Sequence, residues 1–159
     1  MITFKNYLTE ARMAPLYHGT TIYAARDIIK HNELKKSIGD LGSAEPAISF
    51  TRSLHFAKRW AVQQAGERPD EAVVFEIDQQ KLNQNYKIYP FNFFDNVARF
   101  KGAFSIYNEY EERIVGRNIK NFDKYVTKLI VMVKPGKPIK DNVILNYPKL
   151  WYDGKFINK

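Results

Sequence analysis

The segment that most constrains the fold is Ala72-Val73-Val74-Phe75-Glu76-Ile77, in which five of six residues are apolar. The run is too short for an ordinary helix, and its β-branched and aromatic side chains favour a strand. Because apolar residues stand at both parities, both faces of such a strand have to be covered. The segment therefore predicts a central strand of a sheet.

Other segments supply the elements that would surround this strand. The 159 residues suit one compact domain, expected over 15–159. Because short strands outnumber helices in the later part of the chain, the pattern favours an α+β class over regular βαβ alternation. Further strands are expected at 16–18, 47–51, 86–89, 110–115, 126–134 and 143–147, helices at 3–12, from Thr20 or Thr21 to about Asn32 and after Ser53, and irregular segments at 39–46 and 91–107.

The composition excludes several classes of site. Cysteine is absent, so no disulfide, thiolate nucleophile or cysteine metal site is possible, and no two of the three histidines have metal-ligand spacing. A formal net charge of +8 favours a polyanionic partner, such as a nucleic acid, a nucleotide or an acidic protein surface. The alternative is a basic protein whose lysines are simply solvated. No apolar segment is long enough to span a membrane.

The stretch Tyr17-His18-Gly19-Thr20-Thr21 is the first candidate for chemistry. We expect a strand to end on His18, Gly19 to allow a sharp turn, and a threonine to cap the following helix. An imidazole there can donate one hydrogen bond and accept another, which suits a ribose hydroxyl, and the glycine backbone could hold an amide group. The alternative is a histidine that only satisfies nearby carbonyls.

Two further stretches carry polar groups on strands. Ser49 and Thr51 share one strand face, and Phe50 points to the other. Glu109 and Glu111 share a face by the same parity, whereas Glu112 lies with Ile114 on the opposite one. Carboxylates on both faces of a half-buried strand are costly unless they are paired, by Arg113 or Arg117, or functional. The alternative is an edge strand with a solvated, charged face.

His18-Gly19-Thr20, Ser49-x-Thr51 and Glu109-x-Glu111, in this order, resemble the ADP-ribosyltransferase superfamily over most of residues 15–134. The resemblance implies a split, bent antiparallel β core with flanking helices that binds NAD as a substrate. It further implies that His18 binds ribose, that the Gly19 backbone holds the nicotinamide amide, and that Glu111 or Glu112 is catalytic, assisted by Glu109. The NAD contacts it implies are Tyr17, His18, Gly19, Thr20, Ser49, Phe50, Thr51 and Arg52, with Tyr23 or Phe56 stacking on nicotinamide.

The chain departs from both main subclasses of that superfamily. One subclass opens with Arg instead of His18, and the other places Tyr where this chain has Phe50. We prefer Glu111 over Glu112 as the catalytic residue because Glu109 shares its face. Three alternatives stay open: an RNA 2′-phosphotransferase, which relies on basic residues instead of the glutamate; an NAD glycohydrolase; and a non-enzymatic basic head protein that binds DNA.

The N-terminal segment Phe4-Lys5-Asn6-Tyr7-Leu8-Thr9-Glu10-Ala11 resembles the capsid-targeting segment of internal head proteins in large contractile-tailed phages. In those proteins a protease cuts after a Leu/Ile-x-Glu triplet. Here that triplet is Leu8-Thr9-Glu10, so the resemblance implies that residues 1–14 are an N-terminal helical segment that is cut after Glu10. The resemblance implies a mono-ADP-ribosyltransferase located in the phage head and then in the host bacterial cytoplasm. Its partners would be a host protein or nucleic acid acceptor, and also phage DNA or the capsid interior.

Overall fold

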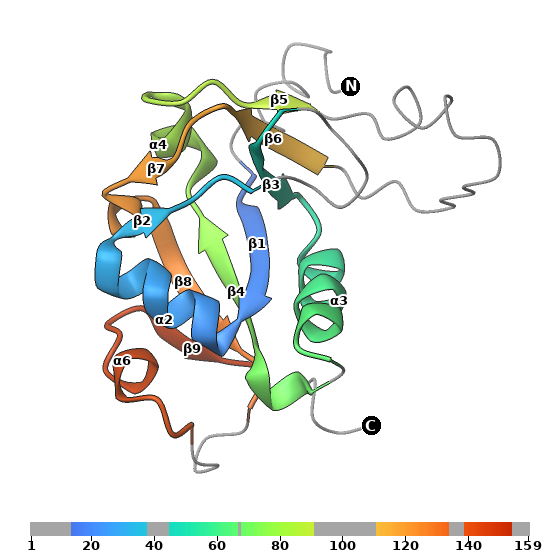
Figure 1. Ribbon diagram of the computed structural model, residues 1–159, viewed down its shortest axis with the longest axis vertical. Coiled ribbons are helices and arrows are strands. Elements are labelled where there is room, and N and C mark those ends of the chain that lie inside the picture. Colours follow the sequence, from blue (N-terminus) through green and yellow to red (C-terminus); the bar gives the residue numbers. More distant parts are fainter. Residues whose placement is uncertain (1–13, 38–44, 67, 91–110, 134–138, 154–159) are drawn as a thin grey trace, which may run out of the picture.

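The computed structural model describes residues 14–37, 45–66, 68–90, 111–133 and 139–153 (Figure 1). The expected helix at 3–12, most of the 39–46 loop and the 91–107 segment lie outside these residues. The described strands are β1 Leu16–Thr21, β2 Glu33–Leu34, β3 Ala47–Thr51, β4 Ala72–Ile77, β5 Tyr89–Pro90, β6 Glu111–Val115, β7 Ile119–Lys120, β8 Val126–Val131 and β9 Leu150–Tyr152. The described helices are α2 Ile22–His31, α3 Leu54–Gln64, α4 Gln79–Asn83 and α6 Asn142–Leu145, with single 3₁₀ turns at Pro69–Glu71 and Phe122–Lys124.

Seven strands form one sheet in the order β5-β6-β3-β1-β4-β8-β9, and β2 pairs with β7 in a separate two-stranded ribbon. The neighbours in the large sheet are antiparallel, except for β8 and β9, which run parallel. The α+β class is therefore confirmed. As predicted, β4 is an interior strand, paired along its length with β1 on one side and β8 on the other.

Different elements cover the two faces of the sheet (Figure 1), and each face has its own core. On one face, β1, β4 and β6 direct Leu16, Phe75 and Ile114 towards α2, the β2–β7 ribbon and α6; we call this the α2 face. On the other face, Ala57 and Ala61 of α3 pack on small and branched side chains of β4 and β8; we call this the α3 face. The alternating parity of β4 explains why Val73 and Phe75 belong to the first core and Val74 to the second.

Gly19 does not make the turn that the sequence suggested. β1 continues through it to Thr21, because the ladder with β4 runs unbroken from Leu16–Ile77 to Thr21–Ala72. A Cβ built on Gly19 would lie 2.2 Å from the carbonyl oxygen of Ala57. The glycine is therefore needed for the close approach of α3 to the sheet, and His18 lies inside the strand instead of at its end.

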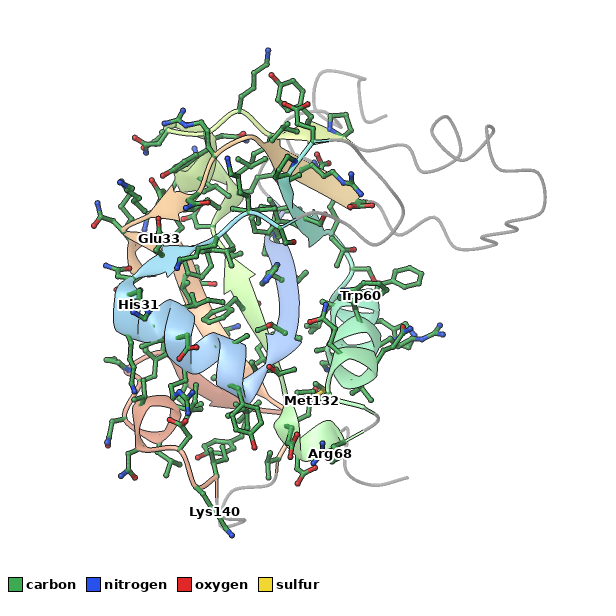
Figure 2. All side chains as sticks on the ribbon, viewed as in Figure 1. His31, Glu33, Trp60, Arg68, Met132 and Lys140 are labelled. Atoms are coloured by element: carbon green, nitrogen blue, oxygen red, sulfur yellow. The ribbon has the colours of Figure 1, made fainter. Side chains whose placement is uncertain are left out.

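Local signals located several helix starts correctly. As expected, the side chains of Thr21 and Ser53 accept hydrogen bonds from the first turns of α2 and α3. Asp78 caps the short helix α4 in the same way. The predicted buried face of α3 is right for Ala57 and Ala61 but wrong for Trp60, which is 46% exposed and labelled on α3 in Figure 2. Gly19 explains the difference, since only small side chains fit where α3 lies closest to the sheet.

Other expected elements need correction. Residues 143–147 form no strand; α6 occupies most of this segment, because Asp141 caps it and Ile144 turns into the core. The strand expected at 86–89 is shorter and later, at Tyr89–Pro90, and β8 ends at Val131. Strands β2, β7 and β9 are too short to carry a periodic signal. Within the described residues, no helix combines the length and apolarity needed to cross a membrane.

Candidate functional site

The three polar stretches of the sequence lie on three adjacent strands, β1, β3 and β6. Tyr17 is opposite Thr51, and Phe50 is opposite Glu112. Extending the β1–β3 register by one residue places His18 opposite Phe50, whose ring centroid lies 5.9 Å from that of the imidazole. His18, Phe50 and Glu112 thus form one row across the α2 face, which we call the His-Phe-Glu row. With strands about 4.8 Å apart, the two ends of the row are roughly 10 Å apart.

The imidazole of His18 is held by the backbone of β3. Its Nδ1 lies 3.0 Å from the carbonyl oxygen of Ser49, which can only accept, so Nδ1 carries the proton. Burial lowers the pKa of His18 below its ordinary value, and the hydrogen bond that its ring donates to the Ser49 carbonyl oxygen opposes this effect. A neutral ring with a protonated Nδ1 leaves Nε2 as an acceptor, which suits the hydroxyl of a ligand.

Glu112 is the buried carboxylate of the site. It is 8% exposed, and its Oε1 accepts from Nε and Nη2 of Arg52 at 2.8 and 2.7 Å. Arg52, immediately after β3, therefore neutralises the carboxylate of Glu112. The sequence had suggested Arg113 or Arg117 as the partner. The alternative of an edge strand with a solvated, charged face is wrong, because β6 lies between β3 and β5 in the sheet. A buried ion pair on the same sheet face as a histidine is a costly arrangement that suits a functional carboxylate.

Glu111 lies on the α3 face, as the predicted parity requires, with a partner of its own. Arg113, next but one on the same strand, donates from Nε to its Oε1 at 2.7 Å. Tyr17, Ser49 and Thr51 share this face, so they are separated from the His-Phe-Glu row by the sheet itself. Glu109 lies outside the described residues. Among the predicted catalytic residues, the structure thus brings Glu112, and not Glu111, onto the face of His18.

The remaining predicted ligand contacts are dispersed. Thr20 is 5% exposed on the α2 face of β1. Tyr23 lies in the first turn of α2 and is 56% exposed. The guanidinium of Arg26 lies 5.9 Å from the centroid of its ring. Phe56 is half-buried in the first turn of α3, across the sheet from α2, against the edge of His55. The two candidates for stacking on nicotinamide therefore belong to opposite faces.

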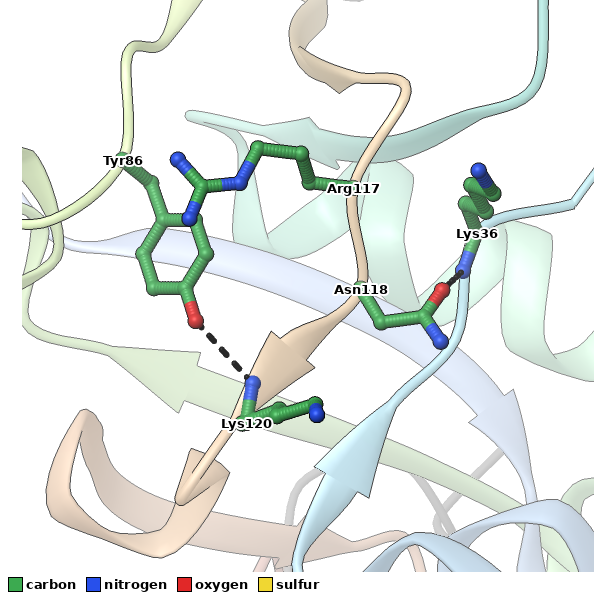
Figure 3. A pocket seen from close by; sticks show the side chains of 5 residues that line it. All are labelled: Lys36, Tyr86, Arg117, Asn118 and Lys120. Carbon is green, nitrogen blue, oxygen red and sulfur yellow. Dashed lines mark hydrogen bonds between the residues drawn. The ribbon is translucent and has the colours of Figure 1, made fainter.

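Sequence analysis missed a basic pocket of about 400 Å³ between the β2–β7 ribbon and Tyr86 (Figure 3). Its lining residues come from three distant segments: Lys36, Tyr86, Arg117, Asn118 and Lys120. Only Arg117 had been singled out, as a partner for the glutamates. The signal that was available is the +8 charge, which predicts a basic surface but not its location.

A second pocket, of about 310 Å³, is mostly apolar and is lined by Ile28, Ile29, Asn32, Phe75, Phe122, Asp123, Tyr147 and Pro148. At its rim the Tyr147 hydroxyl donates to Asp123 at 2.6 Å, which lowers the pKa of that carboxyl. Neither pocket is lined by a member of the His-Phe-Glu row.

The chemistry available at the row is that of a hydrogen-bond acceptor, an aromatic face and a carboxylate paired with a guanidinium. Among the described residues, no group of three or more His, Asp or Glu side chains could hold a metal ion. Comparisons of the chain with protein-family models, curated proteins and solved structures give no match.

Proposed function

We propose that this chain is a phage-encoded mono-ADP-ribosyltransferase with an ADP-ribosyltransferase-like fold, which cleaves the nicotinamide–ribose bond of NAD. The observation that supports the proposal most directly is the His-Phe-Glu row. The family resemblance requires a histidine strand, a middle strand and a glutamate strand to lie side by side in one sheet. β1, β3 and β6 lie in that order, and each contributes one side chain to the same face.

The proposal assigns catalysis to Glu112 instead of Glu111. Glu112 shares the α2 face with His18, whereas Glu111 is on the α3 face and paired with Arg113. Phe50 lies between His18 and Glu112, at the place where the histidine-opening subclass carries Tyr in its middle motif. This assignment removes the reason for preferring Glu111, since Glu109 no longer shares a face with the catalytic residue.

The chemistry proceeds in two steps at the anomeric carbon of the nicotinamide ribose. The C1′–N bond breaks, and its electron pair leaves with nicotinamide, which becomes neutral. The carboxylate of Glu112 stabilises the oxocarbenium ion left on the ribose, while Nε2 of His18 accepts a hydrogen bond from a ribose hydroxyl. An acceptor nucleophile then bonds to C1′ and gives its proton to Glu112 or to water.

Arg52 connects substrate binding to the release of Glu112. Its guanidinium is 26% exposed at the side chain and holds the carboxylate when no substrate is bound. The pyrophosphate of NAD is a better bidentate partner for a guanidinium than one carboxylate oxygen. NAD binding therefore draws Arg52 to the phosphates and frees Glu112 for the ribose.

The test is turnover of isotope-labelled NAD by the full chain, with and without a bacterial lysate. Glu112→Gln is expected to lower nicotinamide release by about 10²–10³-fold. Glu111→Gln is the matched control, because it also removes one carboxylate that is paired with an arginine on β6. Thermal melting of both variants establishes that they fold.

The outcomes separate the proposal from its alternatives. Label retained on protein or nucleic acid, and lost in Glu112→Gln, supports the transferase. Nicotinamide release without retained label supports a glycohydrolase. Full turnover in Glu112→Gln refutes the assignment of the carboxylate. An absence of NAD binding and turnover in the wild type refutes the enzyme and favours a DNA-binding head protein.

Location in the phage head is the part of the proposal carried by the N-terminal segment, which lies outside the described residues. Mass spectrometry of the protein recovered from phage particles is expected to find a chain that starts at Ala11. An intact N-terminus in the particle would contradict cleavage after Glu10.

A further inference from the structure

The basic pocket beside Tyr86 has features that the proposed NAD chemistry does not use. Lys36 follows β2, Arg117 lies in the connection between β6 and β7, and Lys120 ends β7, so three cations from one strand and two connecting segments line one recess (Figure 3). The recess has a volume of about 400 Å³, within the range of pockets that hold small ligands. It is separate from the His-Phe-Glu row, which contributes no residue to it.

The cations of this pocket are held in place by neutral groups. The Arg117 guanidinium lies 5.2 Å from the centroid of the Tyr86 ring, so the aromatic face orients it without occupying its N–H donors. The ammonium of Lys36 donates to the carbonyl oxygen of Gly116 at 2.9 Å. Since an ammonium has three donors, two of them remain for a ligand.

The rest of the lining is equally fixed. The Tyr86 hydroxyl accepts from the backbone N–H of Lys120 at 3.0 Å, and Asn118 Oδ1 accepts from the backbone N–H of Lys36 at 3.1 Å (Figure 3). Tyr86 itself is 8% exposed, with the edge of its ring against Tyr125. The pocket is therefore a preorganised recess whose ligand-facing groups are donors, and its aromatic ring is already covered.

Acidic groups near the pocket leave its positive charge largely intact. Among the described residues, no carboxylate lies within ion-pair distance of Lys36, Arg117 or Lys120. Glu33 is the nearest acidic side chain in register, opposite Lys120 on the ribbon, and its Oε1 accepts from Asn118 Nδ2 at 3.1 Å. Three cations against one carboxylate leave a net charge that favours an anion.

We propose that this pocket binds a backbone phosphate of a single-stranded nucleic acid. An oriented guanidinium with two ammonium groups is the donor set that phosphate oxygens prefer. The overall charge of +8 extends the attraction beyond the pocket, as a polyanionic strand requires. A single strand is favoured over a duplex because its backbone can bend one phosphate into a recess. The proposal is independent of NAD turnover.

The test measures fluorescence anisotropy of a labelled single-stranded DNA about 12 nucleotides long, titrated with the full chain at several salt concentrations. The pocket variant combines Lys36→Gln, Arg117→Gln and Lys120→Gln. The control variant combines Lys30→Gln, Lys81→Gln and Lys140→Gln, which removes three positive charges from exposed positions outside the pocket. Thermal melting of each variant establishes that it folds, and no NAD is present.

The pocket variant is expected to bind the strand at least about tenfold more weakly, since the loss of even one of its three charge-assisted contacts corresponds to about that factor. The slope of log K against log salt should fall by about 0.7, the value for one neutralised phosphate of a single strand. The control variant should lose less than half as much in both quantities. A DNA of the same sequence with an uncharged methylphosphonate backbone should not bind the wild type.

Equal losses in the pocket and control variants would overturn the proposal, because they would show diffuse attraction without a site. So would wild-type binding of the uncharged strand. If adenosine monophosphate binds the wild type as tightly as the strand does, and Arg117→Gln removes both, the source of the phosphate is a free nucleotide and the strand is refuted.

Discussion

Gly19→Ala tests how closely α3 lies against the sheet. The added Cβ would stand 2.2 Å from the Ala57 carbonyl oxygen, whereas ordinary contacts begin near 3.4 Å, so α3 has to retreat by about 1.2 Å. Overpacking of this kind costs about 1–3 kcal/mol, and an obstructing backbone atom cannot rotate away, which favours the upper end. Gly19 has no positive φ, so alanine also restricts the unfolded chain and returns about 0.4–1 kcal/mol. The net expectation is a loss of about 2 kcal/mol.

The measurement is urea unfolding followed by circular dichroism, with thermal melting as a second readout. A loss of about 2 kcal/mol corresponds to a Tm lower by about 4–8 °C for a chain of this size. The double variant Gly19→Ala/Ala61→Gly is the decisive comparison, because Ala61 Cβ is also near, at 3.2 Å. Since the Ala57 backbone is closer, removing the Ala61 methyl group should not rescue stability. A double variant more stable than Gly19→Ala alone, or a stabilised Gly19→Ala, would refute the reasoning.

Three further predictions follow from the described contacts. Arg52→Gln should destabilise the fold by about 3 kcal/mol, because it leaves Glu112 buried without its partner, and adding Glu112→Gln should recover part of that loss in urea unfolding. The pKa of His18 is lowered in the folded state, so the unfolded chain binds more protons than the folded chain below about pH 6.5. The stability of the wild type should therefore fall more steeply than that of His18→Gln as the pH is lowered. The measurement is the Tm of both proteins between about pH 7.5 and 5.5. Asp141→Ala removes the acceptor for two N–H groups at the start of α6 and should cost about 1 kcal/mol in the same unfolding assay.

The parts of the fold that sequence predicted are those with a local signal. Strand Ala47–Thr51 was predicted with its observed bounds, because Pro46 closes the loop before it and Arg52 and the helix cap Ser53 follow it. The caps at Ser53 and at one of Thr20 and Thr21 were predicted because helices favour a Ser or Thr at the N-cap, whose hydroxyl accepts from a backbone N–H of the first turn. The interior position of β4 followed from apolar residues at both parities.

The parts that were wrong depend on distant neighbours. Glycine is typical of turns, but Gly19 is needed inside a strand because α3, more than thirty residues later in the chain, packs closely against it. The segment around Ile144 is rich in β-branched residues, and Asp141 together with burial against α2 makes it a helix. Short apolar runs cannot be assigned to helix or strand by periodicity alone. The basic pocket could not be predicted either, because its lining residues come from segments that are far apart in the sequence, around residues 36, 86 and 117.

The register of β6 determines which glutamate lies on the same sheet face as His18. A slip by one residue would exchange Glu112 for Glu111 on the α2 face and would also move Ile114 out of the core, where it is 2% exposed. That apolar side chain therefore fixes the parity of the carboxylates, and the ion pairs follow: Arg52 meets Glu112, and Arg113 meets Glu111. Under the proposed function, the burial of Ile114 two residues away thus selects the carboxylate that would contact the ribose. Ile114→Thr, which makes that side chain less apolar, should loosen the register and lower NAD turnover even though it touches no substrate atom.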